Sequence, residues 1–142
     1  MKTCCFFGHR DTPQEIKPKL INEIENLIIN ENVNEFYVGN HGGFDLMVAN
    51  ALHELKIKYP HIDYSVVLAY MPKEKVETFE CKHPTLLPEG IESVPKRFAI
   101  NFRNKWIIKN STHAIVYINC TLGGAFKFYE LAEKSGLKII KL

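Results

Sequence analysis

The chain has 142 residues, of which 46% are hydrophobic and 24% are charged, a composition typical of one globular domain. Its 18 lysine and arginine residues nearly balance 16 aspartate and glutamate residues, which gives a formal net charge of +2 with no block of five like charges. We therefore expect neither a nucleic-acid-binding arm nor a membrane-surface segment, and no run approaches the roughly 18 apolar residues of a membrane span.

The four cysteines form no regular disulfide framework. Cys4 and Cys5 are adjacent, Cys81 lies in a polar stretch and Cys120 follows an apolar run. The N-terminal residues also lack the hydrophobic region of a signal peptide, so we expect a cytoplasmic protein. Cys81 and His83 are spaced like metal ligands, but no second pair accompanies them, and we predict no metal and no cofactor.

Apolar runs alternate with segments of helical period along the whole chain. In chain order we predict a strand at 3–7, a helix at 13–31, a strand at 35–38, a helix at 45–59, a strand at 64–70, a loop at 71–96, a helix at 97–109, a strand at 113–118, a helix at 123–134 and a strand at 137–142.

Proline and glycine set several of these boundaries. Thr12 and Pro13 are typical of a capping residue followed by proline at the first helical position. Gly136 is a typical helix stop. The segment 71–96 contains four prolines and no clear period, so we interpret it as a long loop with one helical turn near 73–80.

The alternation of strands and helices predicts a single Rossmann-like α/β domain over 1–142, with about five mostly parallel strands and helices on both faces. Right-handed crossovers place the carboxyl ends of parallel strands at one rim, where such sheets bind ligands. We therefore expect Gly8, Gly39 and Gly123, which follow three of the strands, to share this rim.

Two groups of residues follow the first two strands. Gly8, His9 and Arg10 form a turn from which a histidine and an arginine can reach a phosphate, or else a surface loop in which Arg10 pairs with Asp11. Gly42, Gly43 and Asp45 lie in a glycine-rich turn before a helix, whose free N–H groups favour an anion. In a plainer interpretation, Asp45 is the N-cap of that helix and the glycines only form the turn.

Two more groups lie near the end of the chain. Gly123, Gly124 and Ala125 open the last helix and offer a second anion site, or a tight turn, with Glu130 two helical turns further on. Arg103 and Asn104 lie on the helix at 97–109, where an arginine is more often solvated than functional. Trp106 on the same helix is expected in the core rather than as a stacking platform for a base.

The order of these groups resembles the SLOG superfamily of Rossmann-like nucleotide-binding proteins. The sequence has Gly-His-Arg after the first strand, Gly-Gly-x-Asp after the second, Arg-Asn-x-Trp-x-Ile from Arg103 with Ser111 eight residues after it, and then Gly-Gly-Ala. The superfamily includes the Lonely Guy phosphoribohydrolases, the DNA-processing DprA proteins and many bacterial and phage proteins. The resemblance covers nearly the whole chain and is poorest over 71–96.

The resemblance implies a nucleotide or nucleotide-derived ligand with its phosphate over the glycine turns, bound by a sensor or sequestering module. The alternative it implies is an N-glycosidase that cleaves a nucleoside 5′-monophosphate. Arg103 and Glu130 stand where the Lonely Guy enzymes have their catalytic Arg and Glu. Among relatives of this kind homo-oligomers are common, and apolar residues such as Trp106, Ile107 and Phe128 are candidates for a dimer face. A nucleic-acid partner is not expected.

Overall fold

The sheet of the computed structural model, which describes residues 2–70 and 83–142, has six parallel strands in the order β4-β3-β2-β1-β5-β6. The predicted helical turn near 73–80 lies outside the described residues. The strands are β1 (Lys2–Gly8), β2 (Val33–Val38), β3 (Asp63–Val67), β4 (Thr85–Leu86), β5 (His113–Tyr117) and β6 (Lys138–Lys141). The predicted parallel α/β architecture is confirmed, with one strand more than expected.

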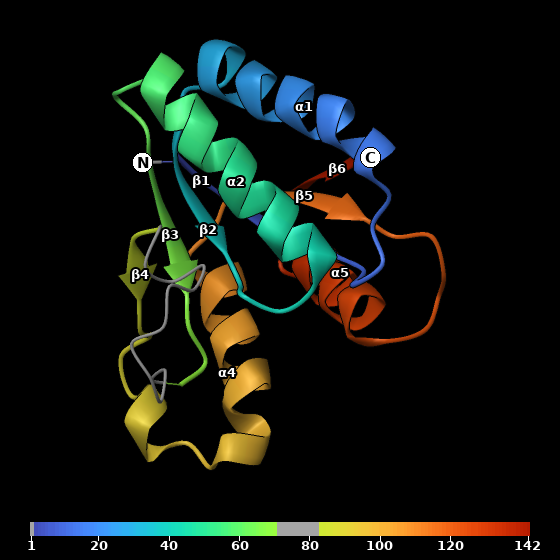
Figure 1. Ribbon diagram of the computed structural model, residues 1–142. Helices are drawn as coiled ribbons and strands as arrows, with labels where there is room; N and C mark the ends of the chain where they lie inside the picture. The colour runs from blue at the N-terminus through green and yellow to red at the C-terminus, as the bar shows by residue number, and fades with distance from the viewer. Residues whose placement is uncertain (1, 71–82) are drawn as a thin grey trace.

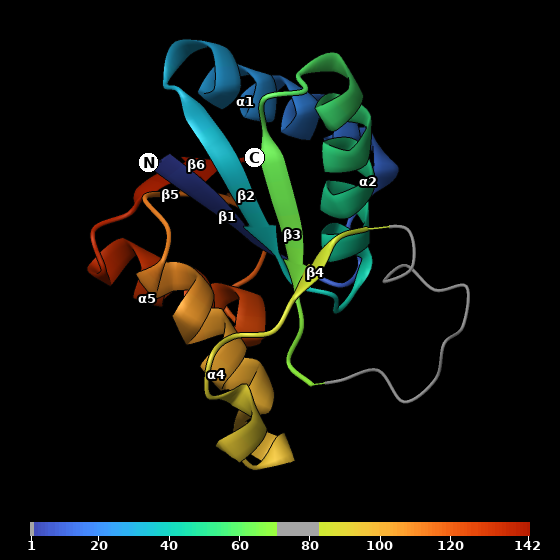
Figure 2. The ribbon, with the colours of Figure 1, turned by 90° about the vertical axis from the view of Figure 1, so that its left-hand side faces the viewer.

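In the described part of the chain, four helices cover the sheet, two on each face (Figures 1 and 2). They are α1 (Lys17–Asn30), α2 (Gly43–Lys58), α4 (Lys96–Lys109) and α5 (Gly124–Lys134), with short 3₁₀ turns at Gln14–Ile16 and Ile91–Ser93. Helices α1 and α2 pack on one face, and α4 and α5 pack on the other (Figure 2). Among the described residues, no helix combines the length and the hydropathy that a membrane crossing requires.

Strand β1 lies at the centre of the sheet with a core on each face, which explains why its sequence is a continuous apolar run. Successive side chains of a strand point to opposite faces. Cys4 and Phe6 therefore join the core beneath α1 and α2, while Cys5 and Phe7 join the core beneath α4 and α5. The pKa of the Cys5 thiol is raised to about 12 because the side chain is fully buried. Both cysteines are free, so neither forms a disulfide.

The additional strand β4 lies within the predicted loop at 71–96. It pairs in parallel with β3, with Val66 opposite Thr85 and Val67 opposite Leu86. The N–H of Val66 also donates to the carbonyl of Pro84 at 2.8 Å. Proline is tolerated beside an edge strand, and a strand of two residues is too short to show a hydrophobic period. No pattern in the sequence therefore indicates β4.

The start of α1 differs from the predicted cap. The Thr12 hydroxyl donates to the carbonyl of His9 at 2.6 Å instead of capping the helix. Pro13 precedes the 3₁₀ turn Gln14–Ile16, and α1 itself begins at Lys17 with a proline in its first turn. Thr12 therefore stabilises the loop after β1, close to the rim where the candidate site lies.

Candidate functional site

The order in which successive strands are added to the sheet reverses at β1. Strands β2, β3 and β4 extend to one side of it and β5 and β6 to the other, which makes the carboxyl end of β1 the switch point where such sheets bind ligands. A cleft of about 430 Å³ opens there, within the volume range of small-molecule sites. We call it the rim cleft; it is lined by Phe6, Phe7, Gly8, His9, Arg10, Gly39, His41, Asp45, Ile100, Asn101, Arg103, Asn104, Gly123, Gly124, Ala125 and Phe128. Gly8, Gly39 and Gly123 thus share one rim, as expected.

Close packing holds the loop after β1 in place, and the guanidinium of Arg10 in this loop has no ion-pair partner among the described residues. A Cβ atom at Gly8 would overlap the buried ring of Phe44, so only glycine fits there. His9 accepts the backbone N–H of Asn119 at its Nε2 atom, at 3.0 Å, which ties this loop to the loop after β5. Arg10 is exposed and lines the cleft, and its guanidinium forms no ion pair with Asp11 or with any other described residue.

The glycine pair before α2 serves loop packing rather than the cleft. Gly42 has a φ of +98°, and a Cβ atom there would lie 2.8 Å from Cγ of Arg10. The N–H of Gly43 donates to the carbonyl of Arg10 at 2.9 Å, and a Cβ atom at Gly43 would overlap that carbonyl oxygen. Neither glycine lines the cleft, because both hold Arg10 in position from behind.

Asp45 lies at the floor of the cleft, in the first turn of α2. The N-cap of the helix is Gly42, so the interpretation of Asp45 as N-cap is wrong. Its Oδ2 atom instead accepts the backbone N–H of His41 at 3.0 Å. Burial raises the pKa of Asp45 to about 6, although the bond from His41 and the nearby charge of Arg103 act in the opposite direction.

Arg103 reaches the same floor from α4 and is only 2% exposed, so it is not a solvated surface arginine. Its Nη1 atom donates to the carbonyl of Val67 at 2.9 Å and to Oδ1 of Asn40 at 3.1 Å. Its Nη2 atom lies 3.1 Å from Nδ1 of His41, which must accept because arginine can only donate. Burial lowers the pKa of Arg103, while the charge of Asp45 acts to raise it. The Nε atom is buried and has no acceptor among the described residues.

The turn before α5 differs from the turn before α2 because it faces open space. Gly123 is the N-cap with a φ of +94°, and no side chain caps the helix. A Cβ atom at Gly123 or Gly124 would meet nothing within 4 Å. The first N–H groups of a helix have no partner within it. Those of Gly124, Ala125 and Phe126 have none elsewhere in the described chain, so this end of α5 is an uncommitted cluster of donors beside the cleft.

Helix α4 supplies the remaining wall, with Ile100, Asn101 and Asn104. Trp106 is half-buried and packs on Tyr37, with ring centroids 5.3 Å apart, against the core beneath α4 and α5, in agreement with its predicted place.

Ile107 and Phe128 are 1% and 5% exposed. They are core residues, so the expectation that they cover a dimer face is wrong for both.

Glu130 lies apart from the other predicted site residues. It is exposed and does not line the cleft. Phe128, Tyr129 and Ala132 are the buried residues of α5. Because an α-helix turns about 100° per residue, Glu130 projects roughly opposite to Phe128, which faces the cleft.

Several lining residues had no place among the predicted ones. Asn101 is three residues before Asn104, so helical spacing alone was a signal for it, and Ile100 is its neighbour. His41 lies in the glycine-rich turn, but the contact that makes it part of the site comes from Arg103 on α4. The described residues contain no group of three potential metal ligands; Cys81 lies outside them.

No protein-family model matches the chain, and no curated protein matches its sequence. The fold is similar to that of DNA processing protein A (DprA) from Streptococcus pneumoniae, with a TM-score of 0.68 and 18% sequence identity. The match covers 99% of this chain and 50% of that protein, so the chain spans about half the length of this neighbour. The likeness establishes a DprA-like, Rossmann-like fold.

Proposed function

We propose that the rim cleft binds a nucleotide or a nucleotide-derived ligand, with its phosphate against the first turn of α5. The observation that carries this proposal is the pairing of free donors with a free cation. The N–H groups of Gly124, Ala125 and Phe126 and the guanidinium of Arg10 lack partners among the described residues, and Gly124, Ala125 and Arg10 line the same cleft. Backbone N–H groups and the positive end of a helix dipole favour an anion, and an arginine adds charge-assisted hydrogen bonds.

The other walls suit the rest of a nucleotide. Arg103 keeps a buried N–H at Nε without an acceptor in the described chain, and such a group is normally satisfied by water or a ligand oxygen. On α4, Ile100 offers an apolar surface beside the amides of Asn101 and Asn104. An apolar contact flanked by groups that both donate and accept is appropriate for the face and the edge of a nucleobase.

We propose binding without cleavage, as in a sensor or sequestering module, rather than N-glycosidase activity. The carboxylate that would serve the alternative reaction, Glu130, is exposed and outside the cleft. If the wild-type protein releases base from nucleoside monophosphates, as seen by chromatography, and Glu130→Gln abolishes the release, the alternative is correct. We expect no release from either protein.

The DprA neighbour is described as a DNA processing protein, but a shared fold at 18% identity does not transfer that role. The cleft is a local pocket, and the net charge of the chain is only +2. Single-stranded DNA is therefore included in the binding test as a competing ligand, and we expect it to bind more weakly than a mononucleotide.

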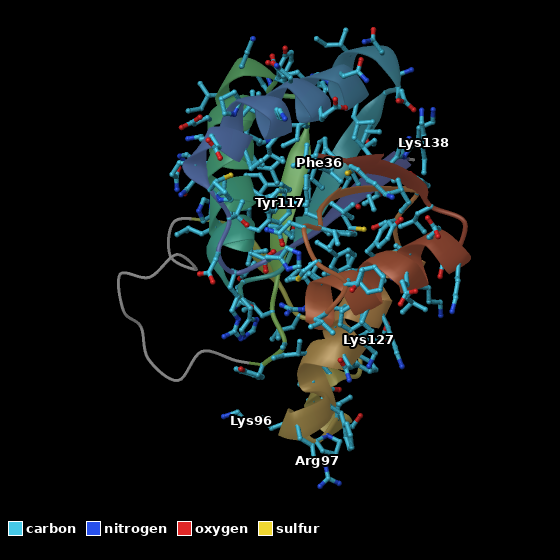
Figure 3. All side chains as sticks on the ribbon, turned by 90° about the vertical axis from the view of Figure 1, so that its right-hand side faces the viewer. Phe36, Lys96, Arg97, Tyr117, Lys127 and Lys138 are labelled. Atoms are coloured by element: carbon cyan, nitrogen blue, oxygen red, sulfur yellow. The ribbon has the colours of Figure 1, made fainter. Side chains whose placement is uncertain are left out.

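The test is calorimetric titration with AMP, adenosine and single-stranded DNA. AMP is expected to bind and adenosine to bind at least tenfold more weakly, because a charge-assisted phosphate contact contributes about 1.5 to 3 kcal/mol. Arg10→Ala should weaken AMP binding about tenfold. Arg97→Ala is the matched control, since Arg97 stacks on Phe98 at the outer end of α4 (Figure 3) and does not line the cleft. Equal affinity of AMP for wild type and Arg10→Ala would place the phosphate elsewhere.

A further inference from the structure

The floor of the rim cleft brings a carboxylate and a guanidinium together over one glycine. A Cβ atom at Gly39 would lie 2.9 Å from Oδ2 of Asp45 and 3.0 Å from Nη1 of Arg103. Asp45 comes from the first turn of α2 and Arg103 from the middle of α4, so the two meet only because the sheet places these helices at the same rim. Their charges influence each other, but they form no direct ion pair within the described structure.

Each of these two groups retains unused hydrogen-bonding capacity. Oδ2 of Asp45 is occupied by the N–H of His41, while Oδ1 has no donor within the described chain. Arg103 has five N–H donors, and two of them, the second N–H of Nη2 and the buried N–H of Nε, have no acceptor among the described residues. The floor therefore combines a spare acceptor, Oδ1 of Asp45, with a spare N–H of Arg103 at Nη2.

This combination favours a group that both donates and accepts hydrogen bonds over a group that does only one of these. A phosphate only accepts hydrogen bonds and would be repelled by the carboxylate of Asp45. An ammonium group only donates and would be repelled by Arg103. A hydroxyl group both donates and accepts, so it can satisfy Oδ1 of Asp45 and a donor of Arg103 at the same time.

We infer that Asp45 and Arg103 read a sugar hydroxyl, so that the rim cleft selects a ribonucleotide over its deoxy counterpart. The inference rests on the proposed nucleotide site. The phosphate lies at the uncommitted end of α5 beside Arg10, and the sugar lies over the floor. Asp45 acts as a specificity-determining residue, because a ligand without the hydroxyl would leave its Oδ1 atom desolvated and unpaired.

The test compares the affinities of AMP, 2′-deoxy-AMP and 3′-deoxy-AMP for the wild-type protein by calorimetry. Charged acceptors form the stronger hydrogen bonds, so we expect at least one deoxy analogue to bind more than fivefold more weakly than AMP. Asp45→Asn should bring all three within fivefold of one another. In this variant the side-chain amide oxygen would take the His41 N–H, which leaves an NH₂ group facing the sugar in place of an acceptor.

Asp11→Asn is the control variant, since Asp11 is exposed, lies next to Arg10 and does not line the cleft. It makes the same change of charge and should keep the wild-type preference. The inference is overturned if both deoxy analogues bind wild type within fivefold of AMP, or if the preference survives in Asp45→Asn. If AMP does not bind wild type at all, the proposed nucleotide site fails, and that outcome is separate from a loss of discrimination alone.

Discussion

Asp45 is held in the folded protein at a cost to stability. Its carboxylate is half-buried at the cleft floor, and burial raises its pKa from 3.8 to about 6 even though His41 and Arg103 favour the charged form. The folded state therefore binds a proton more tightly than the unfolded state does. Stability falls as the pH rises from about 4 to about 6 and then stays level, because above the folded pKa the enclosed charge is present throughout.

Asp45→Asn should remove this pH dependence. A difference of about two pKa units corresponds to at most about 3 kcal/mol, so the variant should be more stable than wild type by roughly that amount at pH 7.5 and by almost nothing at pH 4. Urea unfolding at pH 4, 5, 6 and 7.5 measures the difference. A difference in the free energy of unfolding that stays constant across this pH range would mean that burial does not raise the pKa of Asp45.

At the same scale, the sequence identified Arg10, Asp45 and Arg103 as candidates but not what each one does. An arginine on such a helix is more often solvated, and no local pattern indicated otherwise for Arg103. Its acceptors on Asn40 and Val67 are more than thirty residues away in sequence. Residue type and position after a strand indicate that a side chain can reach the rim. They do not indicate whether its hydrogen bonds are already occupied by the protein.

At the scale of elements, two glycine turns that look alike in sequence behave differently. Gly43 abuts the carbonyl of Arg10, whereas Gly124 faces open space. Gly43→Ala should therefore destabilise the protein by about 1 to 3 kcal/mol through overpacking against backbone. Gly124→Ala should be neutral or stabilising by up to about 1 kcal/mol, because alanine is the better helix former. Thermal unfolding of the two variants compares them, and similar losses in both would contradict the assignment of the turns.

The rotation of α5 about its axis explains why Glu130 does not line the cleft. The resemblance set its distance along the chain from Gly123 but not which way the helix faces. Phe128, Tyr129 and Ala132 pack on the sheet, and this packing turns Glu130 outward. The apolar pattern of the helix contained that information, since Glu130 lies on the side away from Phe128. The neighbouring N-terminal turn was placed at the cleft correctly, because the loop after the carboxyl end of β5 leads into it.

At the scale of the whole molecule, the order of strands and helices was predictable because each element carries its own period. Leu20, Ile24 and Leu27 mark α1, and the continuous run from Thr3 to Phe7 marks a strand buried on both faces. The short edge strand β4 was not predictable, since its pairing with β3 depends on tertiary contacts. The rim position of Gly8 and Gly123 followed from the handedness of parallel connections.

The central claim is that the uncommitted N–H groups at the start of α5 bind a phosphate. Titration of ¹⁵N-labelled protein with AMP, followed by amide NMR, observes these groups directly. We expect the largest shifts at Gly124, Ala125 and Phe126, similar but weaker shifts with inorganic phosphate, and much smaller shifts in Arg10→Ala. Saturable AMP binding that leaves these three amides unmoved, with its largest shifts away from the rim cleft, would contradict the account.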